Sequence, residues 1–109
     1  MRKGLNSFVF GLFFMENRPQ VGVSVIVLRD GKVLVGKRKG SHGAQTWSFP
    51  GGHLEFGEDP VVCVAREALE ETGLRLRNIR PAPYTNDVFS NEGKHYITLF
   101  FVAEARLES

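Results

Sequence analysis

The stretch from Gly52 to Leu74, GHLEFGEDPVVCVAREALEETGL, decides the fold of this chain. Asp59 followed by Pro60 predicts a helix start, because an acidic side chain caps free N–H groups and proline loses no hydrogen bond at the first helical position. Gly73 predicts the helix end, since glycine readily adopts the left-handed conformation that often terminates a helix. We therefore expect one helix over about residues 59–72.

This helix has an apolar face, which we expect to pack on a sheet. At about 100° per residue, that face comprises Val61, Val64, Ala65 and Ala68, with Leu69 at its edge. The single cysteine, Cys63, has no partner for an intrachain disulfide and is interpreted as a free structural thiol.

A second helix face is acidic. Glu67, Glu70 and Glu71 are spaced i, i+3 and i+4, so their carboxylates converge and repel each other by a few tenths of a kcal/mol per pair. A hard divalent cation such as Mg²⁺ would reverse that repulsion, because it binds carboxylate oxygens and water. The simpler alternative is a solvated acidic face, partly neutralised by an ion pair between Arg66 and Glu70.

The stretch resembles the Nudix box, GX₅EX₇REUXEEXGU. All nine specified positions are matched over 23 residues, with Ala68 a soft departure because a larger aliphatic residue is usual there. Beyond the box, residues 21–105 are similar to the MutT-like subgroup, which includes hydrolases of guanine nucleotides and a cytosolic plant member.

The resemblance implies a metal site and a catalytic role for the acidic face. Glu70 and Glu71 match the principal metal ligands of the family. Glu67 matches a residue that binds metal directly or through water, and that acts as general base in some members. The backbone carbonyl of Gly51 or Gly52 commonly completes the coordination. The implied cofactor is Mg²⁺, with Mn²⁺ as an alternative.

Other box positions match supporting residues. Glu58 and Arg66 are expected to hold loop and helix together by ion pairing, with Gly52 and Gly73 completing the structural support of the box. Outside the box, Arg38 matches a residue near the substrate phosphates, and a guanidinium suits phosphate binding because it offers a planar fork of donors. The alternative for Arg38 is a solvated cation at a strand end.

The segments around the box predict β-structure. Val21–Leu28 and Lys32–Lys37 flank Asp30-Gly31, a strong hairpin signal. Residues 49–57 are expected to be irregular, and further strands are expected at 75–79, 84–90 and 95–105. The order predicts an α+β domain with a mixed sheet, and the resemblance implies the Nudix-type α/β/α fold with the box helix on one face.

The bulk composition is that of one ordinary domain. The 109 residues include 14 basic and 12 acidic side chains, a net charge of +2, which predicts no binding to a nucleic acid polymer. The apolar run Phe8–Phe14 is too short to span a membrane, and the lone cysteine favours a cytoplasmic location.

Residues 1–18 are interpreted separately from the Nudix domain, assigned to residues 19–109. Three interpretations of the N-terminal segment remain open: a strand or tail that packs on a partner, a weak export signal, or translated upstream sequence before Met15. The last is favoured, because Met15 directly precedes the first predicted strand.

The chain ends early relative to the family. Nudix domains usually continue beyond the equivalent of Ser109 with another strand, a further acidic residue near the metals and a second helix. We therefore expect a C-terminally truncated fold in which one sheet face lacks its usual helix. Either Phe8–Phe14 or a second subunit would cover that face, and on this basis we expect a homo-oligomer.

The predicted function is Mg²⁺-dependent cleavage of nucleoside triphosphates, including oxidised or modified ones, to monophosphate and pyrophosphate by metal-activated water. Alternatives are hydrolysis of isoprenyl diphosphates or nucleotide sugars, and a nucleotide-binding module without turnover. Trp47 and Phe49 are interpreted as core residues in preference to an aromatic wall for a base. Strands at Tyr84–Phe89 and Tyr96–Leu99 match those that line the substrate pocket in relatives.

Overall fold

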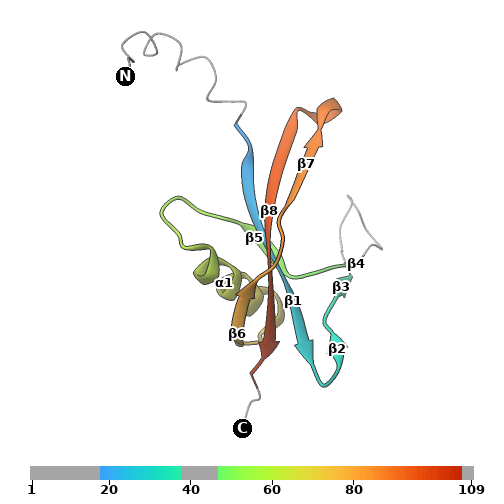
Figure 1. The fold of residues 1–109 in the computed structure, drawn as a ribbon, viewed down its shortest axis with the longest axis vertical. Coiled ribbons are helices and arrows are strands. Elements are labelled where there is room, and N and C mark those ends of the chain that lie inside the picture. Colours follow the sequence, from blue (N-terminus) through green and yellow to red (C-terminus); the bar gives the residue numbers. More distant parts are fainter. Residues whose placement is uncertain (1–17, 38–46, 107–109) are drawn as a thin grey trace.

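A mixed sheet with one helix packed on it forms the described part of the chain, residues 18–37 and 47–106 of a computed structural model (Figure 1). The large sheet has the strand order β2-β1-β8-β6, with β5 also pairing to β1 and β7 to β8. Its strands are β1 (Gln20–Arg29), β2 (Lys32–Val33), β5 (Gly51–His53), β6 (Leu76–Pro81), β7 (Thr85–Phe89) and β8 (Lys94–Ala105). The α+β class with a mixed sheet and the helix on one face is confirmed.

The core lies between this sheet and helix α1 (Pro60–Thr72). Strands β1 and β8 run parallel in register from Gln20↔Tyr96 to Leu28↔Glu104, so paired residues point to the same face. Alternate residues in the second half of β8 and in β1 from Val23 to Val27 are therefore buried against the helix. The buried core comprises Val23, Val25, Val27, Cys63, Val64, Ala68, Phe101, Ala103 and Ala105.

The predicted helix is confirmed at both ends. The Asp59 side chain accepts a hydrogen bond from the Val61 N–H at 2.8 Å, and Pro60 begins the helix. Gly73 adopts the left-handed conformation at φ 76° and donates its N–H to the Leu69 carbonyl. These signals are local in sequence, which is why the helix could be predicted without knowledge of its neighbours.

The predicted packing face is partly wrong. Val64 and Ala68 are buried as expected, but Val61 is 41% exposed and Leu69 38% exposed. Cys63 takes the buried position instead, with its thiol donating to the His53 carbonyl at 3.5 Å. The helix is rotated because its inner face contacts strand β5 as well as β1. Cys63 is confirmed as a free buried thiol, and burial raises its pKa to about 11.

The first predicted hairpin is confirmed at its turn and wrong at its second strand. Asp30 and Gly31 have positive φ angles of 52° and 75°, as a tight two-residue hairpin turn requires. The expected strand Lys32–Lys37 is interrupted, because Leu34 packs on the core and the chain then leaves the sheet. Beyond it, β3 (Gly36–Lys37) pairs with β4 (Trp47–Ser48) in a separate two-stranded sheet.

The prediction of an irregular stretch over residues 49–57 is wrong at its centre. Gly51–His53 forms β5, antiparallel to β1 with Gly52 opposite Val23. Glycine disfavours strands in isolation, but here it permits close approach of two backbones. A Cβ atom at Gly51 would overlap the Val23 carbonyl oxygen. Tertiary pairing therefore overrides the local preference of these residues.

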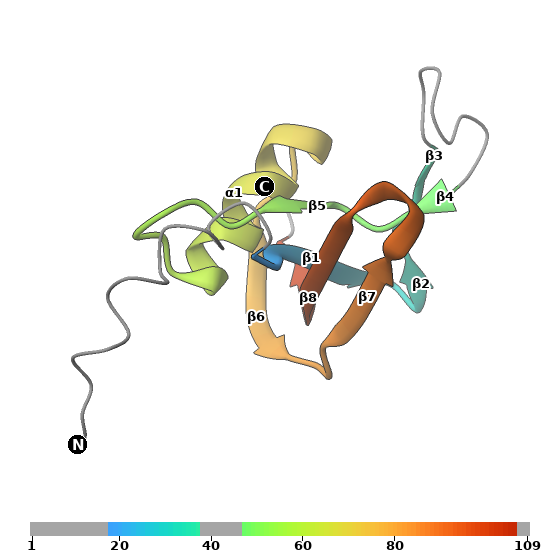
Figure 2. The same ribbon diagram turned by 90° about the horizontal axis from the view of Figure 1, so that it is seen from above.

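The sheet face opposite α1 carries no helix in the ranges 18–37 and 47–106 (Figure 2). The strand register directs Ile26, Leu28, Phe100 and Val102 to this face. The segment Phe8–Phe14, expected to cover it, lies outside the described residues, and homo-oligomerisation stays a prediction. No helix among the described residues is long and apolar enough to cross a membrane.

Candidate functional site

A cavity of about 870 Å³ lies beside the C-terminal end of α1. Its walls come from β1, the β3–β4 pair, β5 and the first half of β8, so it joins segments far apart in the sequence. Glu71 and Thr72 of the helix close one side, and Tyr96, Thr98 and Phe100 line another. The cavity therefore meets the acidic helix face where the helix contacts β5.

The side chain of Glu71 is held against β5, the strand that contains Gly51 and Gly52. The Gly51 N–H donates to Glu71 Oε1 at 3.2 Å, which links residues twenty positions apart in sequence. This contact orients the carboxylate at the cavity wall. Of the three predicted acidic ligands, Glu71 borders the cavity, whereas Glu67 and Glu70 lie farther along the helix face.

Glu67 packs directly against Gly52. A Cβ atom at Gly52 would occupy the position of the Glu67 carboxyl group. The Glu67 side chain is consequently well covered, with 16% of its surface exposed. Glycine at this position therefore permits a helix carboxylate to reach the backbone of β5.

Arg66 connects the loop before the helix to the acidic face. Its Nε donates to Glu58 Oε2 at 2.8 Å, and its second terminal nitrogen donates to Glu58 Oε1 at 3.0 Å, a bidentate pair. The first terminal nitrogen donates to Glu67 at 3.1 Å and to Glu70 at 3.4 Å. Glu58 also accepts the Glu55 N–H at 3.2 Å, which closes the loop.

The ion pair changes how Glu58 and Arg66 titrate. Hydrogen bonding from Arg66 holds the pKa of Glu58 at about 2, below its ordinary 4.5, and the same bond raises the pKa of Arg66. Because the folded-state pKa is depressed, the pair stabilises the fold fully above the unfolded value. That contribution is lost as the pH falls from about 4.5 towards 2.

A pH-dependent stability difference should follow. Glu58→Gln is expected to lower Tm at pH 7 and to flatten the fall of Tm between pH 4.5 and 2, because the variant has no carboxylate to protonate. Thermal unfolding followed by circular dichroism across this range measures both effects. A wild-type minus variant difference that stays constant with pH would contradict the assignment; Glu92→Gln, at an exposed turn, is the control.

The donor set fits a hard divalent cation. Glu67, Glu70 and Glu71 offer charged oxygen ligands on the helix, and Glu67 and Glu71 lie beside the backbone of Gly52 and Gly51. Among the residues that the structure describes, no group of three or more acidic, histidine or cysteine side chains is arranged to hold a metal ion. Arg66 draws Glu67 and Glu70 towards itself, so cation binding would require these carboxylates to rotate.

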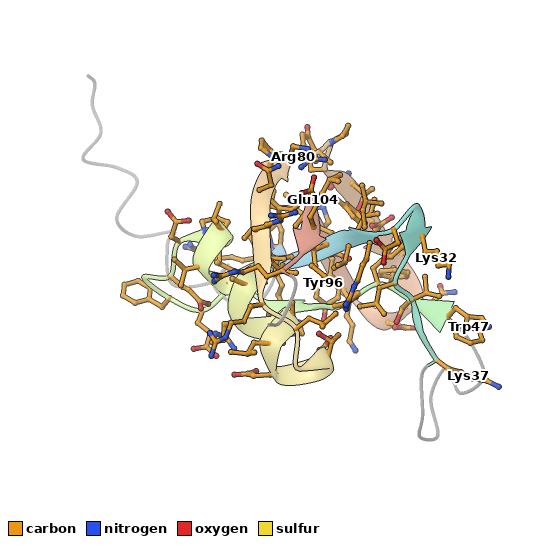
Figure 3. All side chains as sticks on the ribbon, turned by 90° about the horizontal axis from the view of Figure 1, so that it is seen from below. Lys32, Lys37, Trp47, Arg80, Tyr96 and Glu104 are labelled. Carbon is orange, nitrogen blue, oxygen red and sulfur yellow. The ribbon has the colours of Figure 1, made fainter. Side chains whose placement is uncertain are left out.

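The aromatic residues near the cavity differ from the prediction. Trp47 is 63% exposed and Phe49 36% exposed, so neither is a core residue, and both line the cavity. Lys37 lies 5.8 Å from the centre of the Trp47 ring, a cation–π contact across β3 and β4 (Figure 3). Trp47 is exposed because it lies on the small outlying sheet, and Phe49 follows directly after β4.

Three further predictions have mixed outcomes. Tyr96 and Thr98 line the cavity as expected, and the ring of Tyr96 lies 5.7 Å from that of His53. None of the residues Tyr84–Phe89 lines this cavity, because β7 pairs with β8 on the edge away from β5. Arg38, the expected phosphate ligand, lies outside the described residues. Lys37 was not predicted, although it directly precedes Arg38.

Comparisons with known proteins agree with this geometry. A family model described as NUDIX domain matches residues 18–109. The solved MutT NUDIX hydrolase of Burkholderia pseudomallei has a TM-score of 0.74 at 28% identity, covering 83% of this chain and 74% of that one. A NUDIX hydrolase from Nitrosomonas europaea gives 0.74 at 26%, covering 84% and 62%.

Curated relatives match over a shorter stretch. The RNA pyrophosphohydrolase of Pectobacterium atrosepticum is 43% identical over 63 residues, which is 58% of this chain and 33% of the relative. That of Aeromonas hydrophila is 45% identical over 62 residues, 57% of this chain and 33% of the relative. The chain thus spans about a third of the length of these relatives.

Proposed function

Because the chain belongs to the NUDIX domain family, we propose that it hydrolyses a diphosphate linkage of a nucleoside triphosphate. The reaction would use a divalent cation, Mg²⁺ in the first instance. The observation that supports this most is the position of Glu71. It lies at the cavity wall, tied to the Gly51 N–H, beside two further carboxylates on the same helix. The products would be a monophosphate and pyrophosphate.

The carboxylates and the residues that support them would have separate roles in the reaction. Glu70 and Glu71 would hold the cation, with Glu67 as a further ligand or as the base that accepts a proton from the attacking water at its carboxylate oxygen. The cation, when bound, lowers the pKa of water and neutralises charge on the phosphoryl oxygens. Arg66 and Glu58 would keep the loop against the helix, so that the carboxylates retain their positions when substrate binds.

The cavity would receive the nucleoside. Trp47 and Phe49 present exposed aromatic surface on which a base can stack, and Tyr96, which also lines the cavity, offers a hydroxyl group. Lys37, held beside Trp47, would place a positive charge near the phosphates at the mouth of the cavity. Arg38 remains a proposed phosphate ligand on the strength of its sequence position.

A second candidate substrate is the triphosphate at the 5′ end of an RNA chain. The curated relatives that match this chain at 43–45% identity are named RNA pyrophosphohydrolases. The phosphate chemistry at the cleaved bond is the same as for a free nucleotide. The two substrates differ in what lies beyond the first nucleotide.

Product analysis tests the proposal. The protein would be incubated with Mg²⁺ and a panel of nucleoside triphosphates, oxidised nucleotides, nucleotide sugars, geranyl diphosphate and a 5′-triphosphorylated RNA, and products resolved by chromatography. We expect monophosphate and pyrophosphate from at least one nucleotide, lost on chelation by EDTA and restored by Mg²⁺ or Mn²⁺.

Three outcomes would contradict it. Binding of nucleotides in saturating Mg²⁺ without turnover of any panel member would favour a binding module. Turnover that persists in EDTA would exclude the proposed role of the cation. Hydrolysis of geranyl diphosphate alone, to geranyl monophosphate and phosphate, would move the substrate class to isoprenyl diphosphates.

A further inference from the structure

One end of the sheet is strongly basic. This end, here called the basic end, consists of residues 28–33, 75–80 and 102–106, where the β1–β2 turn, the start of β6 and the end of β8 meet (Figure 1). All of its basic side chains belong to exposed residues. They are Arg29, Lys32, Arg75, Arg77, Arg80 and Arg106.

Strand register places these residues at one end of four neighbouring strands, with Arg29 and Lys32 on the face towards α1 and Arg77 on the opposite face. Arg29 pairs with Lys32 across the hairpin, and Arg77 pairs with Glu104 of β8. The Arg106 N–H donates to the Arg75 carbonyl at 2.8 Å, which adds these two residues to the same end beyond the last strand pair. Lys32 and Arg80 lie on different sides of this end of the sheet in the view from below (Figure 3).

The charges of the described residues are segregated, although their sum is zero. The basic end holds six basic and two acidic side chains, a net charge of +4. The remaining described residues hold four basic and eight acidic side chains, a net charge of −4. The overall net charge, from which no binding to a nucleic acid polymer was expected, could not reveal this separation.

Most of the positive charge has no local partner. Glu104 forms ion pairs with Arg77 at 3.5 Å and with Arg80 at 3.8 Å. Arg29 and Lys32 form no ion pair with any residue that the structure describes, and the same holds for Arg75 and Arg106. Exposed guanidinium groups with unused donors suit phosphate oxygens, to which they can bind bidentately.

The basic end lies within reach of the candidate site. Ser24 pairs with Gly51 at that site, and Arg29 is five residues farther along β1, about 16 Å away at the usual rise of a strand. Arg75 follows Glu71 by four residues, which limits the distance between their Cα atoms to about 14 Å. A chain leaving the site would therefore meet the basic end after its first few nucleotides.

We infer that the basic end binds the phosphate backbone of an RNA chain whose 5′ phosphates occupy the candidate site. The inference rests on the proposed function and names the substrate class of that site. The basic end contains no aromatic residue on which bases could stack, so its contacts are to phosphate and are independent of base sequence. Such binding weakens steeply with salt, since each phosphate contact releases counterions.

Charge-removing variants test the inference. The quadruple variant Arg29→Gln, Lys32→Gln, Arg75→Gln, Arg106→Gln removes the cations without an acidic partner in the described chain. A control, Arg18→Gln with Lys94→Gln, removes exposed cations outside the basic end. Binding of a 5′-triphosphorylated RNA of about 12 nucleotides is measured by fluorescence anisotropy, with EDTA to prevent turnover, between about 50 and 200 mM salt.

We expect the quadruple variant to raise Kd at least about tenfold at low salt and to reduce the slope of log Kd against log salt by about 3, as four lost phosphate contacts to a single strand imply. The control variant should change the slope by less than 1. Equal slopes for the quadruple variant and the control would overturn the inference. If the quadruple variant unfolds, two double variants that each carry two of the four substitutions are measured instead. Folded double variants that bind RNA as the wild type does would also overturn the inference.

Hydrolysis of GTP separates this inference from the proposed function. GTP carries no backbone beyond its own phosphates, so the quadruple variant should retain kcat/KM for GTP within about twofold while that for the RNA falls about tenfold. If no nucleotide or RNA is hydrolysed, but RNA binding still depends on the basic end, the proposed function fails and the binding surface stands. If GTP is hydrolysed and RNA binding does not depend on the basic end, the proposed function stands and this inference fails.

Discussion

Glu71→Gln is expected to lower kcat/KM for the best nucleotide about 10³-fold while the protein stays folded. Glutamine keeps an oxygen that can accept the Gly51 N–H, so the 3.2 Å contact to β5 survives. It loses the negative charge that a cation ligand at the cavity wall requires. Removal of several kcal/mol of electrostatic stabilisation corresponds to a loss of this size.

Two measurements make this prediction decisive. Steady-state kinetics would be combined with Tm, which should change by no more than a few degrees because the helix and its hydrogen bond are kept. Glu92→Gln, which removes one exposed carboxylate from the 3₁₀ turn Ser90–Glu92, is the matched control and should leave activity unchanged. Activity of Glu71→Gln within about tenfold of wild type would exclude Glu71 from the reaction.

The two adjacent glycines of β5 should respond to alanine in opposite ways. At Gly52 a methyl group would take the place of the Glu67 carboxyl group, which can swing away because it ends a flexible side chain. Gly52→Ala should therefore retain near wild-type stability but lose about 100-fold in kcat/KM, the effect expected when a reacting group is displaced by an ångström or so. Kinetics and Tm of the same sample measure both.

At Gly51 the methyl group would overlap the Val23 carbonyl oxygen, which belongs to the central strand and cannot move independently. Gly51→Ala should therefore destabilise the fold by about 2–3 kcal/mol through overpacking, as chemical denaturation would show. Equal loss of stability in both variants would mean that β5 is not held as closely against β1 as described. Full activity in Gly52→Ala would exclude a role for the position of Glu67.

Comparison of these two alanine variants therefore tests which glycine supports the fold and which supports the site. Both belong to the same short strand, and both were expected at sequence level to serve the box in different ways, Gly51 as a metal ligand through its carbonyl and Gly52 as structural support. In the structure, Gly51 contacts β1 and Glu71, whereas Gly52 contacts Glu67. The ligand role of the Gly51 carbonyl stays a prediction.

The helix and its chemistry were predictable because their signals are local. The cap Asp59, Pro60 at the first turn and Gly73 at the end act on neighbouring backbone groups, so they work in any surrounding fold. The carboxylate spacing likewise follows from helix geometry alone. The family motif combined these local signals into a recognisable pattern.

The rotation of that helix was not predictable in the same way. Its apolar pattern allowed Val61 or Cys63 to be buried, and the choice was made by contact with β5, whose His53 carbonyl meets the Cys63 thiol. Strand β5 itself exists because Gly51 and Gly52 lie against β1, a pairing between segments some 30 residues apart. Glycine has no strand preference by which sequence alone could reveal it.

By itself, the sequence determined one helix, its two capped ends, its row of carboxylates and the mixed α+β class, since each depends on residues a few positions apart. Tertiary structure alone decided that β5 brings Gly51 to Glu71, that Trp47 stands exposed beside the cavity, and that a neutral set of charges separates into a basic end and an acidic remainder. These features depend on strand register, which joins distant segments by backbone hydrogen bonds that carry no side-chain signature.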